Sequence, residues 1–126
     1  MRLILAIGLG GFLGSILRYL MTKGVQGLSP SDSFPLGTLT VNVVGCLVLG
    51  FLGGLADNQG MFGPEARAFL FFGVLGGFTT FSTFGYDTTK LADGGEYAAA
   101  LINVGLSVML GLSAAWLGYR TSMLVR

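Results

Sequence analysis

Four long apolar stretches, at about residues 3–21, 36–56, 66–86 and 97–119, occupy most of the chain. Each has the roughly 20 mainly apolar residues that a helix needs to cross a bilayer. The prolines Pro30, Pro35 and Pro64 fall between the stretches, where turns belong. Most charged residues fall there as well. The pattern predicts an all-α integral membrane protein, in which residues 1–126 form a single domain of four transmembrane helices.

The composition agrees with a chain that lies in the lipid bilayer. Of the 126 residues, 52% are hydrophobic and only 10% are charged, against roughly 25% charged in an ordinary soluble domain. So few charges exclude a soluble globular protein. Because histidine is absent and Cys46 is the single cysteine, Cys/His metal clusters and disulfide frameworks are excluded, and we expect no enzyme activity. A net charge of +1 without a basic stretch argues against a nucleic-acid partner.

The distribution of positive charges hardly favours one orientation in the membrane. With four spans, the N-terminus, the second loop and the C-terminus share one side, and Lys and Arg normally mark the cytoplasmic side. The side with the two termini carries four such charges, and the side with the first and third loops carries three. A difference of one predicts that the chain inserts both ways and forms an antiparallel dimer. The charges are Arg2, Arg67, Arg120 and Arg126 on one side, and Arg18, Lys23 and Lys90 on the other.

Glycines spaced four apart occur in three of the four stretches. Such GxxxG pairs let another helix backbone approach closely. Packing within the chain explains most of them, and the pattern names no interface. The pairs are Gly10 and Gly14, Gly50 and Gly54, and Gly73 and Gly77.

The third stretch is the least lipid-like, and we expect its helix to break near residues 76–80. Gly76 and Gly77 lie near its middle and are followed by several Thr and Ser residues, which compete for backbone hydrogen bonds. A break would leave free carbonyls that suit a cation such as Na⁺, and free N–H groups that suit an anion. The alternative is an unbroken helix with small residues at a packing seam.

Aromatic and hydroxyl side chains follow this expected break at helical spacing. Helical spacing predicts one face of phenylalanines and an adjoining face of hydroxyls. Hydroxyls donate hydrogen bonds, and aromatic ring edges are electropositive, so both suit an anion. Lipid contact or core packing is the alternative for the phenylalanines. The first face holds Phe78, Phe81 and Phe84, and the second holds Thr79, Ser82, Thr83 and Tyr86.

Further hydrogen-bond donors lie within the other spans. Asn42 has Thr38 one turn before it, and Asn103 has Ser107 one turn after it. Polar groups inside a span suggest function, with an interhelical hydrogen bond as the alternative. Arg18 lies near the end of the first span and could draw anions to a pore mouth. Spans one, two and four hold no acidic residue, which argues against a proton-coupled cation exporter.

Three segments carry a resemblance to a known family. They are Gly-Gly-Phe-Thr-Thr-Phe-Ser-Thr-Phe (76–84), Gly-Thr-Leu-Thr-Val-Asn (37–42) and Gly-Gly-Phe-Leu-Gly-Ser-Ile-Leu-Arg-Tyr (10–19). These segments, the length and the four-span layout resemble the Fluc/CrcB fluoride channel family over nearly the whole chain. The resemblance implies a dual-topology antiparallel homodimer with two pores, which exports cytoplasmic fluoride passively across the inner (plasma) membrane of a microbe.

The resemblance also implies roles for individual residues. Phe81 and Phe84 would line the fluoride pore with Asn42 as a nearby donor, and Gly76 and Thr79 would offer backbone carbonyls to a structural Na⁺ at the dimer interface. The other expected pore residues are Arg18 at the vestibule, Thr38, Ser82, Thr83 and Ser107. The chain departs from the family pattern at Asp87, often Glu, at Asn103, where relatives carry Tyr or His, and at Gly111, where some carry Ser.

Two other functions remain open at this point. A small four-helix multidrug or guanidinium-type exporter has a similar length, but it needs an acidic residue in the first span, and the first acidic residue here is Asp32 in a loop. A non-transporting membrane assembly subunit would explain the small residues, although it leaves the Thr, Ser and Phe cluster without a role.

Overall fold

Four helical segments of membrane-spanning length make up the protein. The computed structural model describes residues 1–125, and these form helices and turns without strands. Three spans are single helices, and the third is a series of short helices over Pro64–Asp93; all four are long and apolar enough to cross a membrane. The elements are α1 (Arg2–Gln26), α2 (Leu36–Gln59), α3 (Pro64–Arg67), the π-helix η1 (Ala68–Leu75), α4 (Gly76–Phe78), α5 (Phe81–Asp93) and α6 (Tyr97–Ser122).

The predicted spans are confirmed, and each helical segment extends beyond the predicted bounds at one or both ends. Polar residues at the ends, such as Lys23 and Gln26, remain part of the helix because their long side chains can extend to water. α2 ends at Gln59 and is followed by Gly60, whose φ of 61° lies in the left-handed region that glycine adopts without strain. Gly95, with a φ of 80°, makes the turn from α5 to α6.

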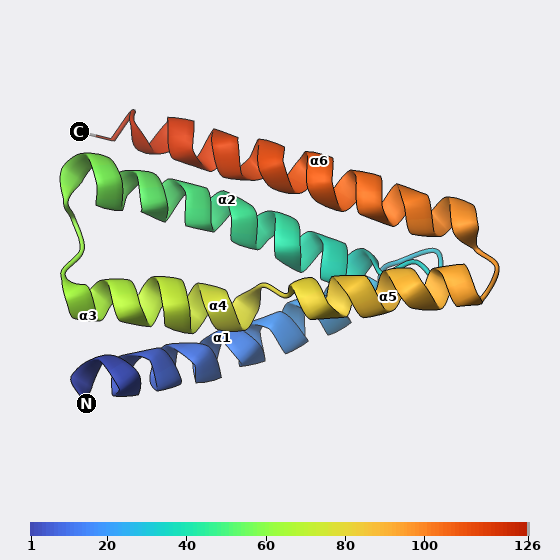
Figure 1. Cartoon of the computed structure of the whole chain (residues 1–126), viewed down its shortest axis with the longest axis horizontal. Helices are drawn as coiled ribbons and strands as arrows, with labels where there is room; N and C mark the ends of the chain where they lie inside the picture. Colours follow the sequence, from blue (N-terminus) through green and yellow to red (C-terminus); the bar gives the residue numbers. More distant parts are fainter. Residues whose placement is uncertain (126) are drawn as a thin grey trace.

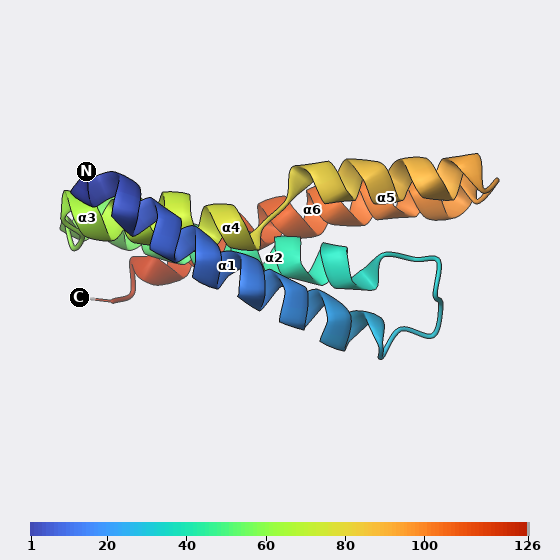
Figure 2. The same ribbon diagram turned by 90° about the horizontal axis from the view of Figure 1, so that it is seen from below.

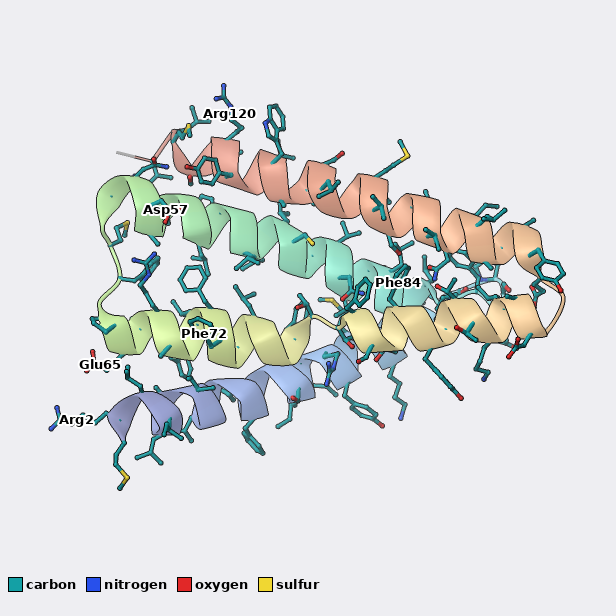
Figure 3. The ribbon with its side chains drawn as sticks, viewed as in Figure 1. Arg2, Asp57, Glu65, Phe72, Phe84 and Arg120 are labelled. Atoms are coloured by element: carbon teal, nitrogen blue, oxygen red, sulfur yellow. The ribbon has the colours of Figure 1, made fainter. Side chains whose placement is uncertain are left out.

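The two ends of the bundle are distinct. Both termini and the α2–α3 connection lie at one end, and the α1–α2 and α5–α6 loops lie at the other (Figure 1). This confirms which segments share a side, although Arg126 lies outside the described residues. The labelled charges Arg2, Asp57, Glu65 and Arg120 gather at the end with the termini (Figure 3). There Arg67 pairs with Asp57 at 3.5 Å.

The third span changes neighbours half-way along its length. Its first half, which includes η1 and α4, packs on α1, whereas α5 packs mainly on α6. α2 packs along α6 and links the two pairs. As a consequence, α5 and the C-terminal part of α1 diverge on opposite sides of the bundle (Figure 2).

Glycine seams make the close helix crossings, so the packing interpretation of the GxxxG pairs is confirmed. A Cβ on Gly73 would lie 2.8 Å from the Cα of Gly10, and on Gly77 it would lie 2.7 Å from the Gly11 carbonyl oxygen. The pair Gly50 and Gly54 faces Ala115 and Ser122 of α6 in the same way.

Replacing Gly77 by alanine is expected to destabilise the crossing of α4 with α1. Backbone atoms cannot retreat as a flexible side chain does, so we expect a loss of about 1–3 kcal/mol in the free energy of unfolding. Gly11→Ala is the matched control, since a Cβ there meets nothing within 4 Å in the chain. Thermal unfolding in detergent measures both variants, and equal stability would contradict the seam.

Candidate functional site

The predicted break of the third helix is confirmed, and it is narrower than expected. α4 ends at Phe78 and α5 begins at Phe81, with Thr79 (φ −83°, ψ 157°) and Thr80 (φ −153°, ψ 120°) in extended conformations. Gly76 and Gly77 remain helical. The π-helix η1 comes before the break, and such wide turns occur frequently at functional sites.

The side chain of Asn42, on α2, forms hydrogen bonds with both backbone groups of Thr80 in the break. Its Nδ2 donates to the Thr80 carbonyl at 2.9 Å, and its Oδ1 accepts from the Thr80 N–H at 2.8 Å. In a continuous helix that N–H would bond the Gly76 carbonyl. The Asn42 amide thus satisfies the backbone groups that the break leaves free, and the predicted interhelical hydrogen bond is confirmed. The amide still has a second N–H to donate.

Thr80 also caps α5. Its hydroxyl accepts from the Thr83 N–H at 3.2 Å and lies 3.1 Å from the Thr83 hydroxyl and 3.2 Å from that of Ser82. Three hydroxyls therefore gather at the helix N-terminus, where the dipole favours negative charge. Sequence reasoning placed Thr80 in the break but missed this role, which the spacing of Thr80 and Thr83 could have indicated.

Phe81 and Phe84 form a pair after the break. Their ring centroids are 5.5 Å apart with an angle of 46° between the planes. Phe81 is 83% exposed, and Phe84 is half-buried at the beginning of α5 (Figure 3). Ser82, Thr83 and Tyr86 are exposed beside them, as expected for a polar face.

Two residues do not join the faces that helical spacing predicted. Phe78 is buried beside Gly45 of α2, and the Thr79 hydroxyl donates back to the Leu75 carbonyl at 3.1 Å. Both predictions are wrong for the same reason. The two extended residues separate α4 from α5, so helical spacing no longer relates positions on opposite sides of the break.

α1 and α5 diverge toward the end with the loops (Figure 2), and residues of α1, α2 and α5 line a groove. It has a volume of about 670 Å³ and brings Arg18, Thr38 and Thr83 together. A neighbouring cavity of about 310 Å³ shares Thr38 and Thr83 and adds Asp87 and Lys90. There the Thr38 hydroxyl donates to Asp87 Oδ2 at 2.8 Å and joins α2 to α5.

The polar residues of α6 lie apart from this groove. Asn103 is 1% exposed, and its Nδ2 donates to the Thr88 hydroxyl at 2.9 Å. Ser107 lies one turn further, and its buried hydroxyl has no hydrogen-bond partner among residues 1–125. Cys46 lies near Gly111, in keeping with a packing residue.

Within the described part of the chain, the end of the first half-helix offers backbone oxygen and no cluster of ionisable side chains. Residues 1–125 contain no group of three or more His, Cys, Asp and Glu side chains that could hold a metal ion. The Gly76 carbonyl has lost its usual helical donor to Asn42, and Gly76 is exposed on the chain surface. Thr79 is extended directly after α4. The Gly76 backbone carbonyl is therefore an oxygen donor of the kind that hard cations take.

Comparison with known sequences decides the family. Residues 5–119 match the family described as CrcB-like protein, Camphor Resistance (CrcB). The chain belongs to the CrcB family. Among similar CrcB proteins, one from Nitratidesulfovibrio vulgaris (strain DSM 19637 / Miyazaki F) is 43% identical over 99% of this chain and 100% of its own length. Another, from Geobacter sulfurreducens, is 45% identical over 94% of each chain. Both carry the name fluoride-specific ion channel FluC.

Proposed function

We propose that this membrane protein is a fluoride-selective channel through which cytoplasmic fluoride leaves passively, down its electrochemical gradient, across the inner membrane. The observation that carries the proposal is the pair of rings formed by the exposed Phe81 and the half-buried Phe84, beside Ser82 and Thr83 and inside a membrane-length segment. The names of the similar CrcB proteins support the same ion. A channel of this kind is a transporter without enzymatic chemistry.

Selectivity follows from the kind of donor that the site offers. Fluoride is small and strongly hydrated, so a pore must replace its water with well-aimed donors while it binds the ion weakly enough to release it. Ring edges of Phe81 and Phe84 are electropositive without carrying a full charge. Hydroxyls and the second N–H of Asn42 add directed hydrogen bonds. A fixed cation in the same place would hold the ion too tightly.

The proposed route begins in the groove between α1 and α5. Arg18, Lys23 and Lys90 outnumber Asp32 and Asp87 in the two cavities, which favours the entry of an anion. From there the route passes the hydroxyls of Thr38, Ser82 and Thr83 and the two phenylalanine rings. The unpartnered hydroxyl of Ser107 supports a further donor on α6.

A second, antiparallel copy would complete the pathway. Phe81, Ser82 and Thr83 are exposed in one chain and lie near the middle of the third membrane-length segment. Polar groups are costly against lipid, so protein or a water-filled pore must cover them. The near balance of positive charge at the two ends supports a partner in the opposite orientation. Such a homodimer would contain two equivalent pores.

A structural Na⁺ is part of the proposal. The carbonyls of Gly76 and Thr79 would hold it at the dimer interface, where the ion would neutralise the negative end of the first half-helix. Its contribution would be to join the two copies.

Gly76→Ala tests this interface. Within one chain the new Cβ would lie 3.6 Å from the Phe71 carbonyl oxygen, which is an ordinary contact. We therefore expect a folded monomer whose dimerisation is weakened by about 1–3 kcal/mol, since the methyl group would intrude between the copies. Sedimentation in detergent with Na⁺ or with K⁺ measures this. Gly53→Ala is the control, with nothing within 4 Å; an unchanged Gly76→Ala dimer would contradict this interface.

Efflux from liposomes that contain the purified protein tests the function itself. A fluoride electrode measures fluoride efflux, and chloride efflux is measured in parallel. We expect fast fluoride efflux with little chloride efflux. Efflux of a guanidinium or multidrug cation instead would support the exporter, and a well-folded dimer without any flux would support an assembly subunit.

A further inference from the structure

A chain of two hydrogen bonds runs from α6 into the first turn of α5. Asn103 Nδ2 donates to the Thr88 hydroxyl at 2.9 Å, and that hydroxyl donates to the Phe84 carbonyl at 2.7 Å. An amide nitrogen only donates, so the Thr88 oxygen must accept from Asn103 and direct its own hydrogen to Phe84. The link therefore has a fixed direction and ends on the residue that carries one of the two pore rings.

Little of α5 is buried within one chain. Leu91, near its end, is the one buried residue of this helix. Side-chain hydrogen bonds supply other links to neighbouring helices, through Thr80 to Asn42, through Asp87 to Thr38 and through Thr88 to Asn103. Asn103 is the buried member on α6, and its environment fixes its position more firmly than an exposed side chain would be fixed. The rotation of α5 about its axis thus depends on these polar links.

We propose that Asn103 and Thr88 are a positioning pair that fixes Phe84, and with it the Phe81 ring 5.5 Å away, in the geometry that conducts fluoride. Neither residue needs to touch the ion. Asn42 holds the residue before the phenylalanines from α2, and Asn103 holds the turn after them from α6. This inference rests on the proposed function, because it assigns the pair to the same pathway.

The test compares fluoride efflux per folded protein among matched variants. Asn103→Leu removes the amide and leaves the Thr88 hydroxyl bonded to Phe84, whereas Thr88→Val removes the hydroxyl at nearly constant shape. We expect each to reduce efflux about fivefold, as loss of one interhelical hydrogen bond in a membrane allows. The double variant should lose no more than the more impaired single variant, because the two residues act as one link.

Two controls separate positioning from general damage. Thr88→Ser keeps the hydroxyl and should restore efflux. Thr89→Val removes the same kind of bond, from the Thr89 hydroxyl to the Gly85 carbonyl at 3.0 Å, at an exposed site without an asparagine partner, and should leave efflux unchanged. Full efflux in Asn103→Leu, or additive losses in the double variant, would overturn the positioning pair. Efflux by the wild-type protein in the same assay would still support the channel. Absence of wild-type efflux would overturn the channel and the inference together.

Discussion

Replacing Phe81 or Phe84 by isoleucine is expected to reduce fluoride flux about a hundredfold or more. Isoleucine has no electropositive edge, so the dehydrated anion would meet alkyl groups where the ring edges are in the wild-type protein. A loss of about 3 kcal/mol at the barrier corresponds to roughly a hundredfold in rate, and an ion without a partner costs at least that much. Liposome efflux with a fluoride electrode gives the rates.

Folding should survive the change at Phe81. Its side chain is 83% exposed in one chain, so little intrachain packing is lost. Phe72→Ile is the matched control, because Phe72 is 72% exposed on the first half of the same span (Figure 3). We expect dimers of all three variants and full flux for Phe72→Ile. Wild-type flux in Phe81→Ile and Phe84→Ile would refute the pore-lining role.

Asn42→Leu is expected to reduce stability and flux together. Leucine would leave both the N–H and the carbonyl of Thr80 without the bonds of 2.8 Å and 2.9 Å that Asn42 supplies. An unsatisfied buried polar group costs about 1–3 kcal/mol. Because Thr80 is half-buried and lines the groove, we expect the free energy of unfolding to fall by about 1–3 kcal/mol for the two bonds together. Unfolding in mixed detergent micelles measures the loss.

The control for Asn42 lies in the same helix. Asn58 donates to the Gly54 carbonyl at 2.8 Å, a bond of the same chemistry near the exposed end of α2. Asn58→Leu should change stability by less than about 1 kcal/mol, since water can replace the lost donor. If Asn42→Leu unfolded no more easily than Asn58→Leu, the bonds to Thr80 would not stabilise the break.

Some features could be predicted from the sequence because they depend on local composition. The four spans follow from apolar length, and the break follows from Gly76, Gly77 and the hydroxyls after them. Features that depend on how the helices face one another could not be predicted from the sequence. Periodicity assigned Phe78 and Thr79 to the wrong faces, because it assumes a continuous helix. The bonds of Asn42 to Thr80 and of Asn103 to Thr88 depend on how far neighbouring helices are shifted along one another, which periodicity within one helix does not specify.

The change of neighbours along the third span has a consequence for synthesis. Domains and helices emerge from the ribosome in order. The segment up to Phe78 finds α1 already inserted, but α5 enters the membrane before its main partner α6 exists. During that interval α2 alone supplies interhelical hydrogen bonds to the polar half, through Asn42 to Thr80 and through Thr38 to Asp87. We therefore expect loss of these side chains to lower the yield of inserted protein, apart from any effect on conduction.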